Sequence, residues 1–269
     1  MRAALALSLL LAAPANANAE LLDFMGGQGC TFGTESRAAA VAAGFAEADI
    51  DALIATALAE SDAEQQGAYV VLERQICTIR LPDGISSPYS VASPEIVAIT
   101  TPINEFASEG QPGCFLTNPR ATFESLGLDE RDYYRFVAAG ILSGDLRQFG
   151  QDPLTVPKGL RVVSEECAAT ADIDAIRSGH VRLQSVFGEY VRQLGERMPC
   201  EGPLPDVMWT TVLSDLLQEA DATYPYDPPP ADYNAWLWLE YLLIFEAAGW
   251  QERRGTNSDE AMPPLCHYD

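Results

Sequence analysis

Few side chains in this sequence are of the types that usually carry catalysis. The chain has two histidines, His180 and His267, so a nucleophilic triad would have to be built on one of them and a histidine-rich metal site is excluded by number. The sequence contains no nucleophile elbow, no His-Glu-x-x-His pair, no phosphate-binding loop and no dinucleotide fingerprint. It therefore predicts neither a cofactor nor a metal ion.

Both histidines also have a structural interpretation. His180 falls on the apolar stripe of a long predicted helix, where a single histidine is usually a hydrogen-bonded core residue. A catalytic or metal-binding His180 is the alternative. His267 follows Cys266 near the C-terminus, and its sequence context offers even less support for catalysis.

Carboxylates are the one catalytic class that the composition leaves open, because paired acids cleave glycosides. With 39 Asp and Glu residues in the chain, a pair such as Glu165 and Glu166 carries little information. Glu240 is the more informative candidate, since it lies inside the most apolar predicted helix, where a buried carboxyl could act as a general acid. The alternative is that Glu240 faces outward or pairs with an arginine.

The cysteines predict a covalent framework. Their number is even and no Cys-x-x-Cys occurs, which favours disulfides over redox catalysis or zinc binding, although six cysteines allow fifteen pairings. An internal repeat narrows the choice, because each copy opens with a cysteine and reaches a second one at a similar distance. The predicted pairs are Cys30 with Cys77, Cys114 with Cys167, and Cys200 with Cys266.

The repeat relates Gly29–Leu58 to Gly113–Leu142. From Arg37 onward the two copies align without a gap, at a constant offset along the chain. In each copy a run of good helix formers ends at a glycine, Gly44 or Gly127, which is typical of a helix stopped by a left-handed residue. Acidic residues then begin a second helix, where they meet the positive end of its dipole. The unit is a helix hairpin, and its acidic second helix argues against reading DNA.

The N-terminus resembles a secretory leader. Arg2 precedes an apolar run from Ala3 to Ala13, and Ala17–Ala19 offers a small-x-small cleavage site before Glu20. We therefore expect a signal peptide over residues 1–19 and a periplasmic or secreted mature protein. No later stretch is long and apolar enough to span a membrane.

The charge excludes two classes of partner. The chain has a formal net charge of -23, and removal of Arg2 with the leader would lower it to about -24. Nucleic acids and anionic membrane surfaces both require basic patches, so neither is an expected partner. Solubility, or adaptation to a salty habitat, is the main interpretation of such a charge, and binding of a basic partner or of cations is the alternative.

Several further elements follow from local patterns. Two short apolar runs, Tyr69–Leu72 and Ile76–Leu81, predict a small β-hairpin. Helices are predicted over Asp172–Met198, Asp206–Ala222 and Tyr233–Trp250. The last is apolar all round, which favours the centre of the core. An exposed aromatic surface for a partner or a sugar is the alternative.

These patterns predict a mainly α, disulfide-stabilised fold with a helix-hairpin duplication and a small β-hairpin. After the leader, residues 20–167 would hold two related units, 29–81 and 113–167, and residues 168–269 a helical part that packs on them. The expected function is a non-catalytic interaction or envelope-associated protein that binds another exported protein. The alternative is a carboxylate-dependent hydrolase acting on a glycan or peptide.

Overall fold

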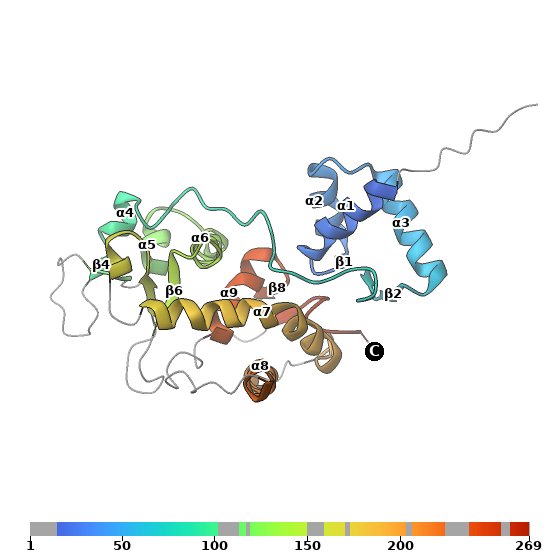
Figure 1. The fold of residues 1–269 in the computed structure, drawn as a ribbon. Helices are drawn as coiled ribbons and strands as arrows, with labels where there is room; N and C mark the ends of the chain where they lie inside the picture. Colours follow the sequence, from blue (N-terminus) through green and yellow to red (C-terminus); the bar gives the residue numbers. More distant parts are fainter. Residues whose placement is uncertain are drawn as a thin grey trace, which may run out of the picture. The chain divides into compact units, whose positions relative to one another are not determined.

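The computed structural model describes residues 15–101, 113–116, 119–149, 159–169, 173–202, 206–223, 237–253 and 259–268. The chain forms two compact units, an N-terminal unit of residues 1–78 and a C-terminal unit of residues 79–269 (Figure 1). A little over half of the described residues are helical, and the described strands form three small antiparallel sheets. The prediction of a mainly α fold is matched in part, because it expected one β-hairpin rather than three sheets.

Three helices build most of the N-terminal unit: α1 (Ala15–Gly26), α2 (Thr34–Ala42) and α3 (Glu47–Glu60). The predicted glycine stop between α2 and α3 is confirmed, because Gly44 has a φ of +103°. The next residue, Phe45, donates its backbone N–H to the Ala40 carbonyl at 3.1 Å and so closes the last turn of α2.

A three-stranded sheet completes this unit, in the order β1 (Thr31–Phe32), β3 (Tyr69–Leu72), β2 (Ala63–Gln66). The predicted hairpin partner of β3, Ile76–Leu81, was wrong. The backbone N–H groups of Ile76 and Cys77 bond back to the Glu73 carbonyl in a turn. The true partner, β2, is an exposed or half-buried polar strand, so its sequence lacks the apolar alternation that marks a half-buried strand.

The C-terminal unit begins with short elements and a second helix pair. After α4 (Pro94–Val97) come α5 (Pro119–Ser125) and α6 (Glu130–Ser143), with Gly127 at a φ of +76° between the pair. Asp129 caps α6, because its side chain accepts a hydrogen bond from the Asp132 backbone N–H at 2.9 Å. The acidic helix start predicted from the sequence is therefore present.

The sheet of this unit has four strands. Their order is β4 (Thr100–Thr101), β5 (Phe115–Leu116), β7 (Gly159–Val162), β6 (Leu146–Phe149), and all neighbours are antiparallel. A 3-10 helix, η1 (Glu165–Ala169), follows β7.

Three longer helices and a hairpin finish the chain. They are α7 (Ile173–Arg197), α8 (Asp206–Thr223), α9 (Leu237–Ala248), β8 (Gln251–Arg253) and β9 (Asp259–Ala261). Within the unit α9 packs against α6, and α7 packs against α8 (Figure 1). One hydrophobic core joins these helices to the second helix pair. The predicted division after residue 167 stays a prediction.

Aromatic rings fill the centre of that core. Phe245 of α9 lies within 6.3 Å, centroid to centroid, of Tyr190, Trp209, Tyr241 and Trp250. The described part of α9 is buried or half-buried throughout, which fits the prediction of a central helix rather than an exposed aromatic surface.

All six cysteines form disulfides, and the pairs are those predicted from the repeat: Cys30–Cys77, Cys114–Cys167 and Cys200–Cys266. They fit an oxidising compartment. The leader and its cleavage site stay predictions, since residues 1–14 lie outside the described residues. The expected cleavage after Ala19 would fall within α1 and would leave the buried Leu21 and Met25 in the mature chain.

Candidate ligand-binding groove

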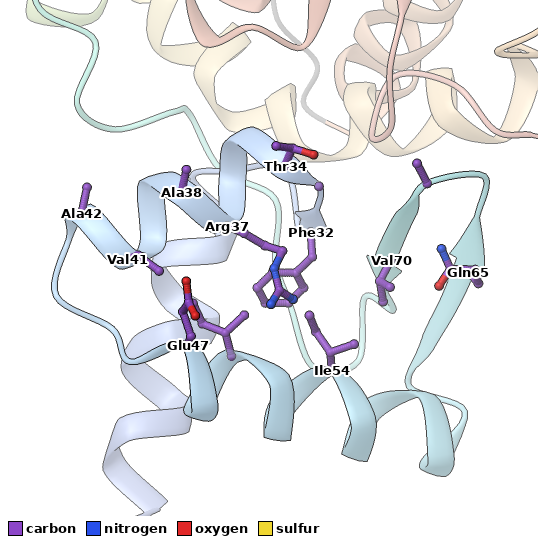
Figure 2. Close-up of a pocket in the computed structure, with 13 residues that line it drawn as sticks. Phe32, Thr34, Arg37, Ala38, Val41, Ala42, Glu47, Ile54, Gln65 and Val70 are labelled. Atoms are coloured by element: carbon purple, nitrogen blue, oxygen red, sulfur yellow. The ribbon is translucent and has the colours of Figure 1, made fainter.

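A groove with a cavity volume of about 700 Å³ lies within the N-terminal unit (Figure 2). Helices α2 and α3 form two of its walls, and the β2–β3 hairpin forms the third. This volume falls in the range of about 300–1,000 Å³ that is typical of ligand sites. The lining residues are Phe32, Gly33, Thr34, Arg37, Ala38, Val41, Ala42, Glu47, Ile50, Ile54, Gln65, Ala68 and Val70.

The floor of the groove is apolar and firmly packed. Phe32 and Ile50 are 2% and 0% exposed, and Val70 is buried as well. At the rim, by contrast, Val41 is 41% exposed although it is a large hydrophobic residue. A buried apolar floor below an exposed apolar rim is a surface that gains free energy when a ligand covers it.

Charged side chains from both helices flank this floor. The Arg37 Nη2 atom lies 2.5 Å from the Asp51 Oδ1 atom, so this ion pair ties α2 to α3. Figure 2 shows Arg37 extending from α2 into the groove and Glu47 at the start of α3. Arg37 is the one cation among the lining residues, and its charge is already matched by Asp51. The remaining carboxylate of Glu47 makes the rim net acidic.

Close packing fixes the upper end of the groove. A β-carbon added to Gly33 would lie 2.6 Å from ring atoms of Tyr69. A side chain at position 33 would therefore force the Tyr69 ring to move, and glycine avoids this clash. Ser36 also braces this end, because the Gly33 backbone N–H donates to its hydroxyl oxygen at 2.8 Å and the hydroxyl donates to the Thr31 carbonyl at 2.7 Å.

Glu240, the acid singled out from the sequence, lies in the other unit. It sits in the first turn of α9 and is 1% exposed, so it does not face outward. Burial raises the pKa of its neighbour Tyr241 well above the ordinary value, and the charges of Tyr190 and Glu240 raise it further. A buried Glu240 fits an internal role in the core, and a catalytic role stays a prediction.

The histidines also lie in the C-terminal unit. His180 belongs to α7, but its side chain lies outside the described residues. His267 has a structural setting: its Nδ1 atom is 2.8 Å from the Gly195 carbonyl oxygen, and its backbone N–H donates to the Met198 carbonyl. These contacts pin the C-terminal tail to the end of α7.

The sequence did not single out the groove. Its lining comes from four segments of the N-terminal unit, and more than half of the lining residues are small or polar and form no motif. The predicted repeat offered one signal, because its alignment places Arg37 opposite Arg120. A basic residue at both positions of so acidic a chain favours a specific contact.

Comparisons with known proteins give no family for this chain. No protein-family model, no curated protein and no solved structure matches it. In the part of the chain that the structure describes, no cluster of His, Cys, Asp and Glu could hold a metal ion. Nor is any described helix long and apolar enough to cross a membrane.

Proposed function

We propose that this is an exported, non-catalytic binding protein whose groove between α2, α3 and the β2–β3 hairpin receives part of another exported protein. The observation that carries the proposal is the apolar floor under an exposed, charged rim. Apolar contact supplies affinity in such a site, and a few charges orient the partner.

Export rests on the predicted leader over residues 1–19 and is supported by the three disulfides. Glutathione and thioredoxin keep such bonds reduced in most cytosols, so they favour the periplasm or the exterior.

The alternative, a carboxylate-dependent hydrolase, has less support at the groove. General acid catalysis requires a carboxyl whose surroundings favour its protonated form. Asp51 is instead 65% exposed at its side chain and is paired with Arg37. Glu47 is exposed as well.

We also infer that the two helix-hairpin units arose by duplication of one ancestral unit, because corresponding strands of the two units pair with each other in the same way. In one unit Thr31 faces Val71 and Ala63 faces Leu72; in the other Phe115 faces Arg161 and Leu146 faces Val162. Strand order is β1-β3-β2 in the first and β5-β7-β6 in the second.

Hydrogen bonds at corresponding places support the same inference. Phe45 and Leu128 each donate to the carbonyl five residues earlier at 3.1 Å, and the two donors occupy equivalent positions of the repeat. The first disulfide cysteine of each unit accepts from β3 or β7, through Leu72 and Val162, at 2.8 Å in both cases. The connections differ in length, since two residues separate β2 from β3 and nine separate β6 from β7.

Site-specific photo-crosslinking in the native envelope tests the binding proposal. A photoreactive residue at Val41, on the groove rim, should give one dominant protein adduct. The matched control is Val97 of α4, which is 48% exposed and lies in the other unit. An adduct from Val41 alone supports the proposal, whereas no adduct, or the same adducts from both positions, contradicts it.

A further inference from the structure

We propose that the groove's partner segment is an amphipathic helix with basic residues beside its apolar face, lying along α3 as α9 lies along α6. The inference rests on the proposed function and names the chemistry of the partner.

The first step is the packing of α6 in the C-terminal unit. Helix α9 packs against both α6 and β6 (Figure 1). The face of α6 that is buried in this core has the three- and four-residue spacing of a helix stripe. It consists of Tyr134, Val137, Ala138 and Ile141, which are 0–5% exposed.

The corresponding face of α3 is uncovered. In the alignment of the two copies the four equivalent positions are Asp51, Ile54, Ala55 and Leu58. Leu58 is 39% exposed, where its counterpart Ile141 is 1% exposed. Among the described elements of the N-terminal unit, α3 packs chiefly on α1 and β2. A stripe that is buried in the core of the second unit thus has a largely exposed counterpart in the first.

The groove continues this face. Ile54 belongs both to the uncovered stripe and to the groove lining, beside Ile50 and opposite Val70 of the hairpin. Figure 2 shows Ile54 on α3 between the helix and the strands. An amphipathic helix presents anchors at positions i, i+3 or i+4, and i+7, which is the pattern that a groove along one helix can accept.

Charge determines which kind of helix fits. Glu47 stands at the N-terminal end of α3 beside the Arg37–Asp51 ion pair, and the chain as a whole carries a net charge of -23. Basic residues flanking the apolar anchors would be attracted to this end, and acidic helices would be repelled. The same repulsion disfavours a second copy of this chain.

A pair of synthetic peptides tests the inference on the intact mature protein. One peptide has leucine anchors at helix spacing with lysine elsewhere, and the other has glutamate in place of lysine. Binding is measured by fluorescence anisotropy, and backbone NMR shifts locate the site. We expect the lysine peptide to bind, with shift changes concentrated in α3 and the β2–β3 hairpin. Its binding should weaken as salt is raised, and the glutamate peptide should not bind.

Two matched variants test whether the position of an added negative charge matters. Leu58→Asp places a carboxylate on the proposed helix contact, and Leu126→Asp adds the same charge at a site in the other unit that is 40% exposed. We expect Leu58→Asp to weaken the lysine peptide about tenfold or more, and Leu126→Asp to leave it unchanged. Circular dichroism confirms that both variants fold; if Leu58→Asp does not, Leu58→Ala and the NMR shifts decide. Equal binding by both folded variants, or by both peptides, overturns the inference.

Failure of the helix inference can be distinguished from failure of the binding proposal. Mass spectrometry of the Val41 adduct identifies the partner segment. A crosslinked partner whose contact segment is an extended strand or lacks basic residues contradicts the helix and leaves the binding function intact. If Val41 gives no adduct, the binding proposal and the helix inference are both contradicted.

Discussion

Two tyrosines in the core of the C-terminal unit should make its stability fall steeply above pH 10. Tyr190 is 0% exposed and donates its hydroxyl to the Trp209 carbonyl at 3.0 Å. Tyr241 is 3% exposed, and the two rings lie 5.1 Å apart between centroids. Burial raises the pKa of both phenols above the ordinary value of about 10, because an ionised phenol would lose its water.

The sign of the effect follows from linkage. The folded pKa of each phenol lies above the unfolded pKa, so the stabilising contribution is complete below pH 10 and is lost as the pH rises towards the folded pKa. At pH 11, one unit above the unfolded value, each tyrosine should lower the free energy of unfolding by about 1.4 kcal/mol. The pair together should lower it by about 2.8 kcal/mol.

Urea unfolding followed by tryptophan fluorescence measures this loss, because all four tryptophans lie in the C-terminal unit. Tyr190→Phe should cost about 1 kcal/mol at pH 8, since the Trp209 carbonyl loses a donor. The same variant should remove half of the alkaline loss, and Tyr190→Phe combined with Tyr241→Phe should remove nearly all of it. An alkaline loss that is as large in the double variant as in the natural protein would refute this account of the core.

Three further predictions concern packing and processing. Gly195→Ala should lower the free energy of unfolding by about 1–2 kcal/mol in urea titrations despite better helix propensity, because the new β-carbon would lie 2.5 Å from the Pro264 carbonyl oxygen; unchanged stability would contradict this packing. Replacing Cys30 and Cys77 by alanine should destabilise the N-terminal unit by about 4 kcal/mol for its loop of 47 residues, measured by helix circular dichroism. An effect below 1 kcal/mol would show that this bridge is dispensable. N-terminal sequencing of the exported protein should begin at Glu20, and a mature chain that begins at any other residue would disprove the predicted cleavage site.

Local sequence signals predicted much of the framework. The three disulfide pairs were inferred from the predicted repeat rather than from local chemistry. The helix stops at Gly44 and Gly127 and the acidic start of α6 depend instead on a few adjacent residues. Each has a short-range physical cause, such as a left-handed glycine or a carboxylate cap. Such features are readable because no distant partner decides them.

Structural features that depend on residues far apart in the chain could not be predicted from the sequence. Strand β2 is polar and is fixed only by its pairing with β3. Arg147 and Arg161 face each other across β6 and β7 and are 6% and 2% exposed, although arginine is rarely buried. The Arg147 Nη1 atom donates to the Ile141 carbonyl at 2.8 Å, a contact that only the folded helix and strand create. The groove belongs to the same class, since four segments make it.

The equivalent residues Arg37 and Arg120 show how one type of helix hairpin could serve two different purposes. Arg37 pairs with Asp51 on α3, and Arg120, its counterpart in the second copy, donates to the Tyr134 hydroxyl on α6 at 2.8 Å. Both contacts span 14 residues and join the first helix to the same position of the second. Arg120 also pairs with a carboxylate, since its Nη2 atom lies 2.6 Å from the Glu130 Oε1 atom. Under the proposed duplication the link was therefore retained, while the residue at this position became a phenol and the carboxylate partner came from one turn earlier. A buried phenol suits a helix covered by α9, and an exposed carboxylate suits a helix that stays available to a partner.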